Sequence, residues 1–265
     1  MSYEGYAGRT LIARNLFQAA VLHSSAPVQL ACFDIEKPDL IQLMAVQDLD
    51  QEEIVASQPV IDISKCRYCG ACVGYCPEQA LQFNRFVPSV TLIVSRCFGC
   101  GECLRGCTRD GLKMKEKAVG KIVKGKLNGH WFIGGQLEKG CELKVPLVKA
   151  LLDRLNVQAT VVCDFGPGDG RAVSAGLSGM DFAVVVVEPE AEWKRNLETM
   201  CLLLEKCSVP FGVILNKVKG DSEFGNEANA YCSKHDFAEF GLIPYESCFE
   251  CQSDLENRDT VEVMK

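Results

Sequence analysis

Short runs of apolar residues recur along the chain, and between them lie segments in which apolar residues return every three or four positions. The runs are strand-sized and continuous, a pattern typical of strands that are buried on both faces of a sheet. We predict strands at 28–34, 160–164, 182–187, 211–215 and 241–245.

The intervening segments have the period of amphipathic helices. One predicted helix carries Val145, Val148, Leu151, Leu152 and Leu155 on a single face. Another carries Trp193, Leu197, Met200, Cys201 and Leu204. Because strands alternate with helices, we predict an α/β fold with a mostly parallel sheet and flanking helices.

Composition narrows the class of protein. The hydrophobic content of 48% and the charged content of 24% are ordinary for a soluble globular chain. No apolar run approaches the roughly 20 residues that a membrane helix needs, and the start of the sequence does not have the pattern of a signal peptide. We therefore expect a cytoplasmic protein. The net charge of −7 argues against nucleic acid as the main partner, because phosphate binding needs a basic face.

The sequence holds 16 cysteines, and many of them crowd into one stretch with metal-ligand spacing. Residues 61–81 and 92–112 repeat each other without a gap, at an offset of 31 residues. All four cysteines of the first segment have counterparts in the second, and Gly70 matches Gly101. We interpret this as an internal duplication that forms an inserted, bacterial ferredoxin-like α+β domain at 57–118.

Each half of the duplication has the spacing C-x2-C-x2-C-x3-C. In bacterial two-cluster ferredoxins with this spacing, the fourth cysteine of one half ligates the cluster of the other half. The spacing therefore predicts two [4Fe-4S] clusters. The first is assigned to Cys66, Cys69, Cys72 and Cys107, and the second to Cys97, Cys100, Cys103 and Cys76.

Zinc is the alternative occupant, since it also accepts four thiolates. Zinc motifs usually separate two C-x2-C pairs by a longer stretch, whereas here four cysteines are packed together twice. The spacing favours iron-sulfur clusters for this reason.

The segments around the cysteine-rich insert resemble the MinD/ParA-type (SIMIBI class) P-loop ATPases, in particular those that carry an inserted ferredoxin domain. L-A-C-F-D-I-E-K-P-D-L (30–40) resembles the switch I strand, in which Asp34 would face the metal and nucleotide. V-V-C-D-F-G-P-G-D-G (161–170) resembles switch II, which places Asp164 after a strand. The resemblance implies a discontinuous P-loop-type domain at 1–56 and 119–265.

Two further segments carry the resemblance toward the C-terminus. F-G-V-I-L-N-K (211–217) resembles the strand whose terminal residue, here Asn216, reads adenine, and G-L-I-P-Y (241–245) resembles the next strand. Read without the resemblance, the two aspartates could be polar residues that cap strand ends, and Asn216 could be a turn residue.

The phosphate loop departs from the family pattern K-G-G-x-G-K-[ST]. The matching stretch is E-G-Y-A-G-R-T (4–10), which keeps Gly8 and Thr10. Glu4 brings negative charge where the family has a lysine, Tyr6 replaces a glycine, and Arg9 replaces the phosphate-binding lysine. We therefore expect ATP and Mg²⁺ to bind weakly or not at all and hydrolysis to be lost.

Cys248 and Cys251 form a C-x2-C pair near the C-terminus. Related ATPases use such a pair, one from each subunit, to share a cluster across a homodimer, although it sits elsewhere in their chains. A zinc site, a redox role and two unused thiols remain alternatives.

Two functions remain after these observations. The first is an electron-transfer protein that relays electrons through two clusters to or from a partner redox enzyme, and the acidic net charge suits a partner with a basic patch. The second is an ATPase that assembles clusters or metallocofactors or gates electron transfer, which requires a competent phosphate loop.

Overall fold

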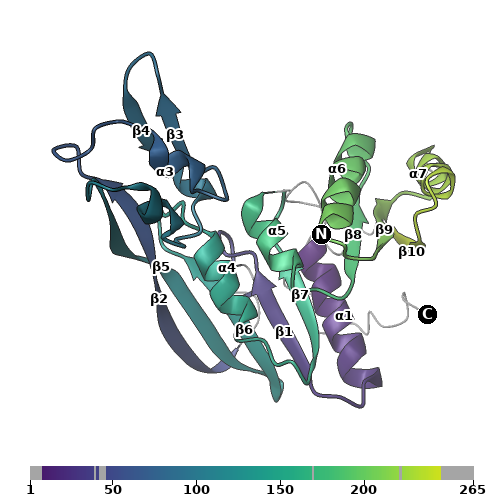
Figure 1. Cartoon of the computed structure of the whole chain (residues 1–265). Coiled ribbons are helices and arrows are strands. Elements are labelled where there is room, and N and C mark those ends of the chain that lie inside the picture. The colour runs from purple at the N-terminus through teal and green to yellow at the C-terminus, as the bar shows by residue number, and fades with distance from the viewer. Residues whose placement is uncertain (1–7, 39, 42–45, 169, 221–222, 246–265) are drawn as a thin grey trace.

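The structure is a computed structural model, which describes residues 8–38, 40–41, 46–168, 170–220 and 223–245. Within these residues the strands form one five-stranded, one three-stranded and one two-stranded sheet (Figure 1). The larger sheet has the order β2 (Gln47–Ile61), β5 (Leu112–Leu127), β6 (His130–Leu137), β1 (Val28–Phe33) and β7 (Thr160–Phe165). The three-stranded sheet has the order β10 (Glu239–Pro244), β9 (Phe211–Val218) and β8 (Ala183–Val187).

The strands that the sequence pattern predicted, β1, β7, β8, β9 and β10, pair in parallel. β1 runs parallel to both β6 and β7, and β9 runs parallel to both β8 and β10. All six residues of β1 are buried, as expected for a central strand covered on both faces. Its one polar side chain, Gln29, accepts a hydrogen bond from the Asn156 backbone N at 2.9 Å, which compensates for its burial.

Helices cover both faces of the sheets. Alternate residues of β1 point to opposite faces: Ala31 packs in one core with α4 (Val145–Leu152), whereas Leu30 packs in another with α1 (Arg9–His23). α1 also reaches the smaller sheet, because Ile12 packs against Val186 and Ile214. The other helices are α5 (Arg171–Leu177), α6 (Trp193–Lys206) and α7 (Glu223–Lys234).

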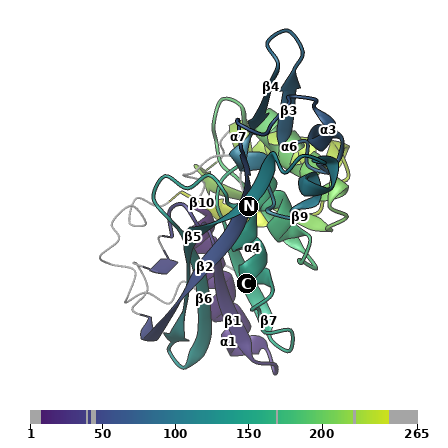
Figure 2. The same ribbon diagram turned by 60° about the vertical axis from the view of Figure 1, so that its left-hand side comes forward.

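The cysteine-rich stretch lies at one end of the molecule, at the top of Figure 2. β2 and β5 pair antiparallel along their lengths and form a long ribbon that leads to it. Between them lie α3 (Ala71–Gly74), β3 (Leu81–Asn84), β4 (Ser89–Leu92) and the 3-10 helices η1 (Val94–Arg96) and η2 (Glu102–Gly106). The predicted boundary at 57 lies on β2 and the one at 118 lies on β5, two residues apart in the register of this ribbon. Ser57 pairs with Glu116, and Val55 pairs with Ala118.

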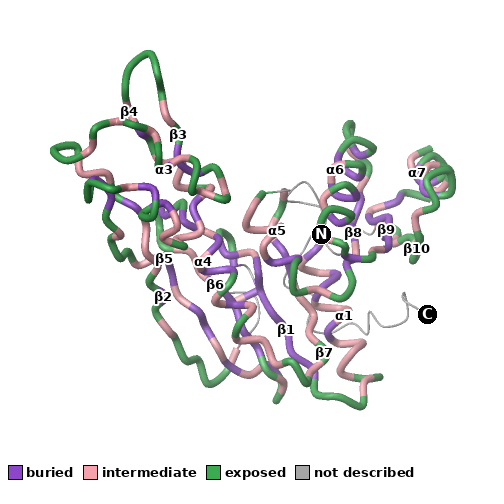
Figure 3. The backbone as a smooth tube through the Cα atoms, in the orientation of Figure 1, coloured by how far each residue is buried: buried purple, intermediate pink, exposed green. Residues whose placement is uncertain are grey.

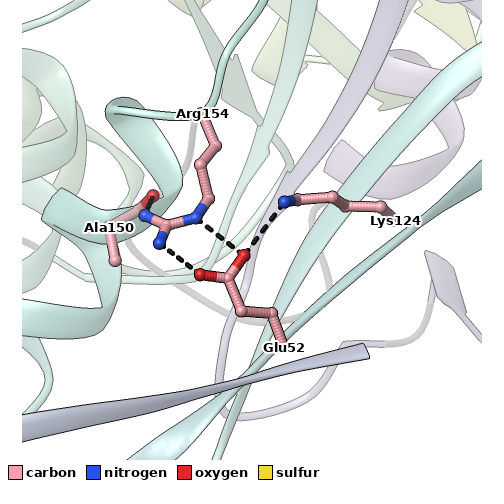
Figure 4. A network of polar contacts seen from close by, with 4 residues as sticks. All are labelled: Glu52, Lys124, Ala150 and Arg154. Atoms are coloured by element: carbon pink, nitrogen blue, oxygen red, sulfur yellow. Dashed lines mark hydrogen bonds and ion pairs between the residues drawn. The ribbon is translucent and has the colours of Figure 1, made fainter. Parts of the chain in front are cut away.

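A polar network fixes the ribbon to the body of the protein (Figure 4). Glu52 of β2 accepts hydrogen bonds from Arg154 Nε at 3.0 Å and from Lys124 Nζ of β5 at 2.9 Å. Arg154 also donates to the Ala150 carbonyl at 2.8 Å, which anchors it to α4. These hydrogen bonds from Arg154 and Lys124 lower the pKa of Glu52 to about 2.

Several element limits differ from the sequence-based expectation. The predicted helix through Leu155 ends at Leu152, and the last strand begins at Glu239 rather than Gly241. The antiparallel strands β5 and β6 were not predicted, because lysines and glycines interrupt their apolar pattern. In the described part of the chain, no helix combines the length and the apolar character needed to span a membrane.

Candidate functional site

Four thiols gather at the outer end of the insert. Cys72 lies in the first turn of the short helix α3 and is buried, whereas Cys69 is exposed. Burial raises the pKa of the Cys72 thiol, and the nearby thiols of Cys107, Cys66 and Cys69 raise it further. The structure thus brings the predicted fourth ligand, Cys107, beside three cysteines of the other half.

The other four thiols surround a small cavity. Cys76, Cys97, Cys100 and Cys103 all line a space of 20 Å³, together with Glu78 and Phe98 among other residues. Burial raises the pKa of Cys103 to about 11, and the charges of Cys76, Cys97 and Cys100 add to this shift. A thiol from the first half therefore completes the group formed by the second half.

Backbone geometry repeats in the two halves. Gly70 and Gly101 precede α3 and η2 with φ of 75° and 77°, a left-handed conformation that favours glycine. Backbone N–H groups also point at sulfur: Ala80 N lies 3.2 Å from Cys76 Sγ, and Gly99 N lies 3.4 Å from Cys97 Sγ. Such donors favour the thiolate form, which is the form that binds metal.

Zinc would gather its sulfur ligands within about 2.3 Å of one ion. Among the described residues, no group of three or more His, Cys, Asp or Glu side chains is close enough to hold a single metal ion.

The two thiol groups differ in their surroundings. The group with Cys72 packs within the insert, against Leu81, Val90 and Leu112. Cys97 belongs instead to the main core, which it shares with Phe165 and other residues of the α/β body. Lys149 of α4 lies over the Phe98 ring, 4.7 Å from its centre. We call the first group the outer thiols and the second the inner thiols.

One ion pair also connects the inner thiols to the body. Glu78, two residues after Cys76, pairs with Arg171 at the start of α5. Arg171 follows the loop that begins after Asp164 and Phe165, so the pair joins the insert to the segment that resembles switch II. Sequence reasoning missed this contact, because nothing in the motifs marks Glu78 or Arg171.

The predicted nucleotide-site residues lie together at the carboxyl ends of β1, β7 and β9. Thr10 Oγ1 donates to Asp164 Oδ2 at 2.8 Å. A Cβ added to Gly8 would lie 2.5 Å from Asn216 Nδ2, and one added to Gly166 would lie 3.2 Å from Asp34 Oδ1. Burial raises the pKa of Asp164 to about 6, although Thr10 and Arg9 oppose this shift.

Arg9 is buried in this arrangement. Only 7% of it is exposed, and within the described part of the chain its Nε and Nη1 atoms have no hydrogen-bond partner. It lines a cavity of 190 Å³ between β7 and β8, together with apolar side chains such as Ile12 and Leu177. Burial lowers the pKa of Arg9, while Asp164, Asp34 and Glu188 oppose the shift.

Four other residues singled out in the sequence, Glu4, Tyr6, Cys248 and Cys251, lie outside the described residues.

Comparison with known proteins gives a match for part of the cysteine-rich stretch and matches for the fold. The family described as "4Fe-4S binding domain" (Fer4) matches residues 59–82. By sequence, no curated protein matches the chain.

Solved structures with a similar fold share little sequence with the chain. A putative plasmid partition protein from Borrelia burgdorferi B31 bound to AMPPNP has a TM-score of 0.53 at 12% identity, with 97% of this chain and 88% of that chain covered. The septum site-determining protein MinD from Pyrococcus horikoshii OT3, complexed with Mg-ADP, has a TM-score of 0.53 at 14% identity, with coverages of 93% and 79%. A chain of the MinC:MinD cell division protein complex from Aquifex aeolicus has a TM-score of 0.52 at 16% identity, with coverages of 99% and 86%. The chain therefore has the fold of the MinD/ParA-type P-loop ATPases and contains a 4Fe-4S binding domain.

Proposed function

We propose that this protein is an iron-sulfur electron-transfer protein that holds two [4Fe-4S] clusters on a MinD-like scaffold. The observation that carries the proposal is the cavity bordered by four inner thiols, one of which, Cys76, comes from the other half of the duplication. Such crossing is the ligand pattern of bacterial two-cluster ferredoxins.

The outer cluster would be held by Cys66, Cys69, Cys72 and Cys107, and the inner cluster by Cys97, Cys100, Cys103 and Cys76. When bound, such clusters take up and release single electrons. The protein's own part is to supply eight thiolates, to aim backbone N–H groups at two of them and to exclude water with apolar side chains. Residues 57–118 would form the electron-transfer domain, and 1–56 with 119–265 the scaffold.

We propose further that the scaffold docks the protein to a redox enzyme in the cytoplasm and that its nucleotide site is impaired. The burial of Arg9 supports the second part, because a buried guanidinium beside Asp164 and Asp34 is poorly placed to meet a phosphate. Glu4 and Tyr6 add charge repulsion and bulk in the sequence of the loop.

The test is anaerobic purification followed by iron and sulfide analysis. We expect about eight iron atoms per chain and, after reduction, interacting S = 1/2 centres by electron paramagnetic resonance (EPR). Two zinc ions without visible absorbance would reject the proposal, and about four iron atoms would leave a single cluster.

Nucleotide binding is a second candidate function. It is favoured by the grouping of Gly8, Thr10, Asp34, Asp164 and Asn216 and by the nucleotides bound to two of the similar proteins. In that case the protein would assemble clusters or gate electron transfer. It would act as a homodimer, in which Cys248 and Cys251 of each subunit contribute to a shared metal site. Micromolar binding of Mg-ATP with turnover would establish this function.

A further inference from the structure

The net charge of the cysteine-rich insert differs in sign from the net charge of the rest of the chain. Residues 57–118 contain nine lysines and arginines against five aspartates and glutamates, a net charge of +4. Since the whole chain carries −7, the remaining residues carry −11. The iron-sulfur insert is therefore basic before its clusters are counted, whereas the scaffold is strongly acidic.

Basic residues lie close in sequence to the outer thiols in particular. Lys65 and Arg67 flank Cys66, Arg109 follows Cys107 by two residues, and Lys113 lies on β5; all four are exposed. We call Lys65, Arg67, Arg109 and Lys113 the basic collar. Figure 3 shows that this end of the molecule is largely exposed.

Contacts within the insert place the members of the collar near one another. The backbone N of Asp62 donates to the Gly111 carbonyl at 2.9 Å, and a Cβ on Gly111 would lie 3.1 Å from Cys66 Cα. This brings the segment of Arg109 and Lys113 beside the segment of Lys65. Hydrogen bonds from Ser64 lower the pKa of Asp62, and the charges of Lys65 and Lys113 contribute to the same shift.

Few acidic groups offset the collar. Asp62 is half-buried and accepts hydrogen bonds from Ser64 N at 3.1 Å and Ser64 Oγ at 2.6 Å. Asp110 is exposed beside Arg109. The side chain of Ile63, two residues before Lys65, is also exposed, to 76%. Cys69, the exposed thiol of the outer group, lies two residues beyond Arg67.

We propose that the basic collar is the docking surface for an electron carrier that presents a carboxylate-rich face. This inference rests on the proposed electron-transfer function. Complementary charge guides such partners together and orients them, and it does so over a surface that an electron can cross at the outer thiols. In each encounter one electron passes between the two proteins: the carrier is oxidised by one electron and the iron-sulfur protein is reduced by one, with no bond formed or broken.

The proposal reverses the expectation drawn from net charge. An acidic chain as a whole suits a basic partner, but charges more than about one Debye length away, roughly 8 Å at physiological salt, are largely screened at a contact. The charges beside the outer thiols therefore decide the partner, and among the side chains at this surface the four cations of the collar outnumber the carboxylates of Asp62 and Asp110. The acidic scaffold would disfavour docking of the same carrier elsewhere.

The test compares two variants with the same loss of four positive charges. One carries Lys65→Gln, Arg67→Gln, Arg109→Gln and Lys113→Gln. The control carries Arg195→Gln, Lys206→Gln, Lys219→Gln and Lys234→Gln, all at exposed positions on the scaffold. Calorimetry on iron-containing protein at physiological ionic strength measures binding of short poly-L-glutamate, poly-L-lysine and an oligothymidylate. Stopped-flow spectroscopy measures reoxidation of the reduced protein by ferric EDTA, an anion, and by hexaammineruthenium(III), a cation.

We expect poly-L-glutamate to bind the unaltered protein and the control with the same affinity. Its affinity for the collar variant should be lower by about tenfold or more. Reoxidation by ferric EDTA should slow in the collar variant only, and reoxidation by the ruthenium complex should not slow. Equal effects in both variants, preferred binding of poly-L-lysine, or tighter binding of the oligothymidylate would each overturn the proposal. Iron content and bleaching by dithionite, measured first, test the electron-transfer function separately, and the calorimetric result stands without them.

Discussion

Arg171 donates to Glu78, and this ion pair is a direct polar link between the loop after Asp164 and the loop that presents Cys76 to the inner thiols. Both side chains are partly exposed, at 39% and 26%, so the pair contributes little to stability, about 0–1 kcal/mol. Its electrostatic effect falls on the cavity of the inner thiols, which Glu78 lines.

Replacing Arg171 with Gln should therefore change the inner cluster and leave the outer one unaltered. The uncompensated carboxylate of Glu78 disfavours an added electron, so the midpoint potential of the inner cluster should become more negative. Glu78→Gln should shift it the opposite way. Potentiometric titration followed by EPR measures both shifts. Arg195→Gln, which breaks an exposed ion pair on α6, is the control and should change neither potential.

The cluster ligands are tested by Cys107→Ser. Because Cys107 packs in the same hydrophobic cluster as Cys72 and its charge acts on that thiol, its loss should damage the cluster of Cys66, Cys69 and Cys72. Iron should fall from about eight to about four atoms per chain, with the signal of the inner cluster retained. Cys76→Ser should give the converse, and Cys232→Ser, at a buried cysteine far from both groups, should change nothing. Loss of the inner cluster in Cys107→Ser would refute the crossed assignment.

Asp164 should make stability fall as pH rises. Burial raises its pKa to about 6, above the usual value of 3.8, so the folded state favours the protonated carboxyl. The stability gained from this preference is complete below pH 3.8 and is lost as pH rises through 6. Asp164→Asn should thus stabilise the protein more at pH 7.5 than at pH 5.5, by at most about 1 kcal/mol.

Urea unfolding at the two pH values measures this difference. Asp181→Asn, at an exposed position, is the control and should show no such pH dependence. An equal effect of Asp164→Asn at both pH values would mean that this carboxyl titrates normally in the folded protein.

Mg-ATP should bind weakly or not at all, and phosphate release should be negligible. The expected causes are Glu4, which repels phosphate, Tyr6, which crowds it, and Arg9, which is buried. Glu4→Lys, Tyr6→Gly and Arg9→Lys combined should raise the affinity, because charged hydrogen bonds contribute about 1.5–3 kcal/mol each. Calorimetry and a phosphate-release assay on iron-containing protein measure both quantities. An unchanged affinity in the triple variant would show that other features of the site prevent binding.

Sequence predicted the parts of the fold that carry a strong local signal. The all-buried strand β1 and the helix α6 lie where their apolar patterns place them, and the MinD/ParA-type fold was recognised from short motifs. The spacing of the cysteines also predicted a 4Fe-4S binding domain, which the family match at residues 59–82 confirms. β5 was missed because it alternates lysines with small and apolar residues over 16 positions, and only its pairing with β2 explains the pattern.

The contacts between the insert and the body could not be predicted, because they join residues far apart in sequence. Glu78 and Arg171 are 93 positions apart, and Glu52 and Arg154 are 102 apart. The burial of Arg9 was also beyond the motif, since a P-loop pattern implies a cation that faces the ligand. Net charge is limited for a related reason: a total over the chain says nothing of how the charges are divided in space.

The antiparallel ribbon of β2 and β5 limits how the length of the molecule can be altered. Side chains alternate between its two faces, so a change of one residue in either strand would turn every later side chain to the wrong side. Only matched insertions or deletions of two residues in both strands would preserve the pairing that runs from Val55 with Ala118 to Ile61 with Leu112. The distance between the thiols and the sheet can therefore be changed only in steps of two residues, about 7 Å each.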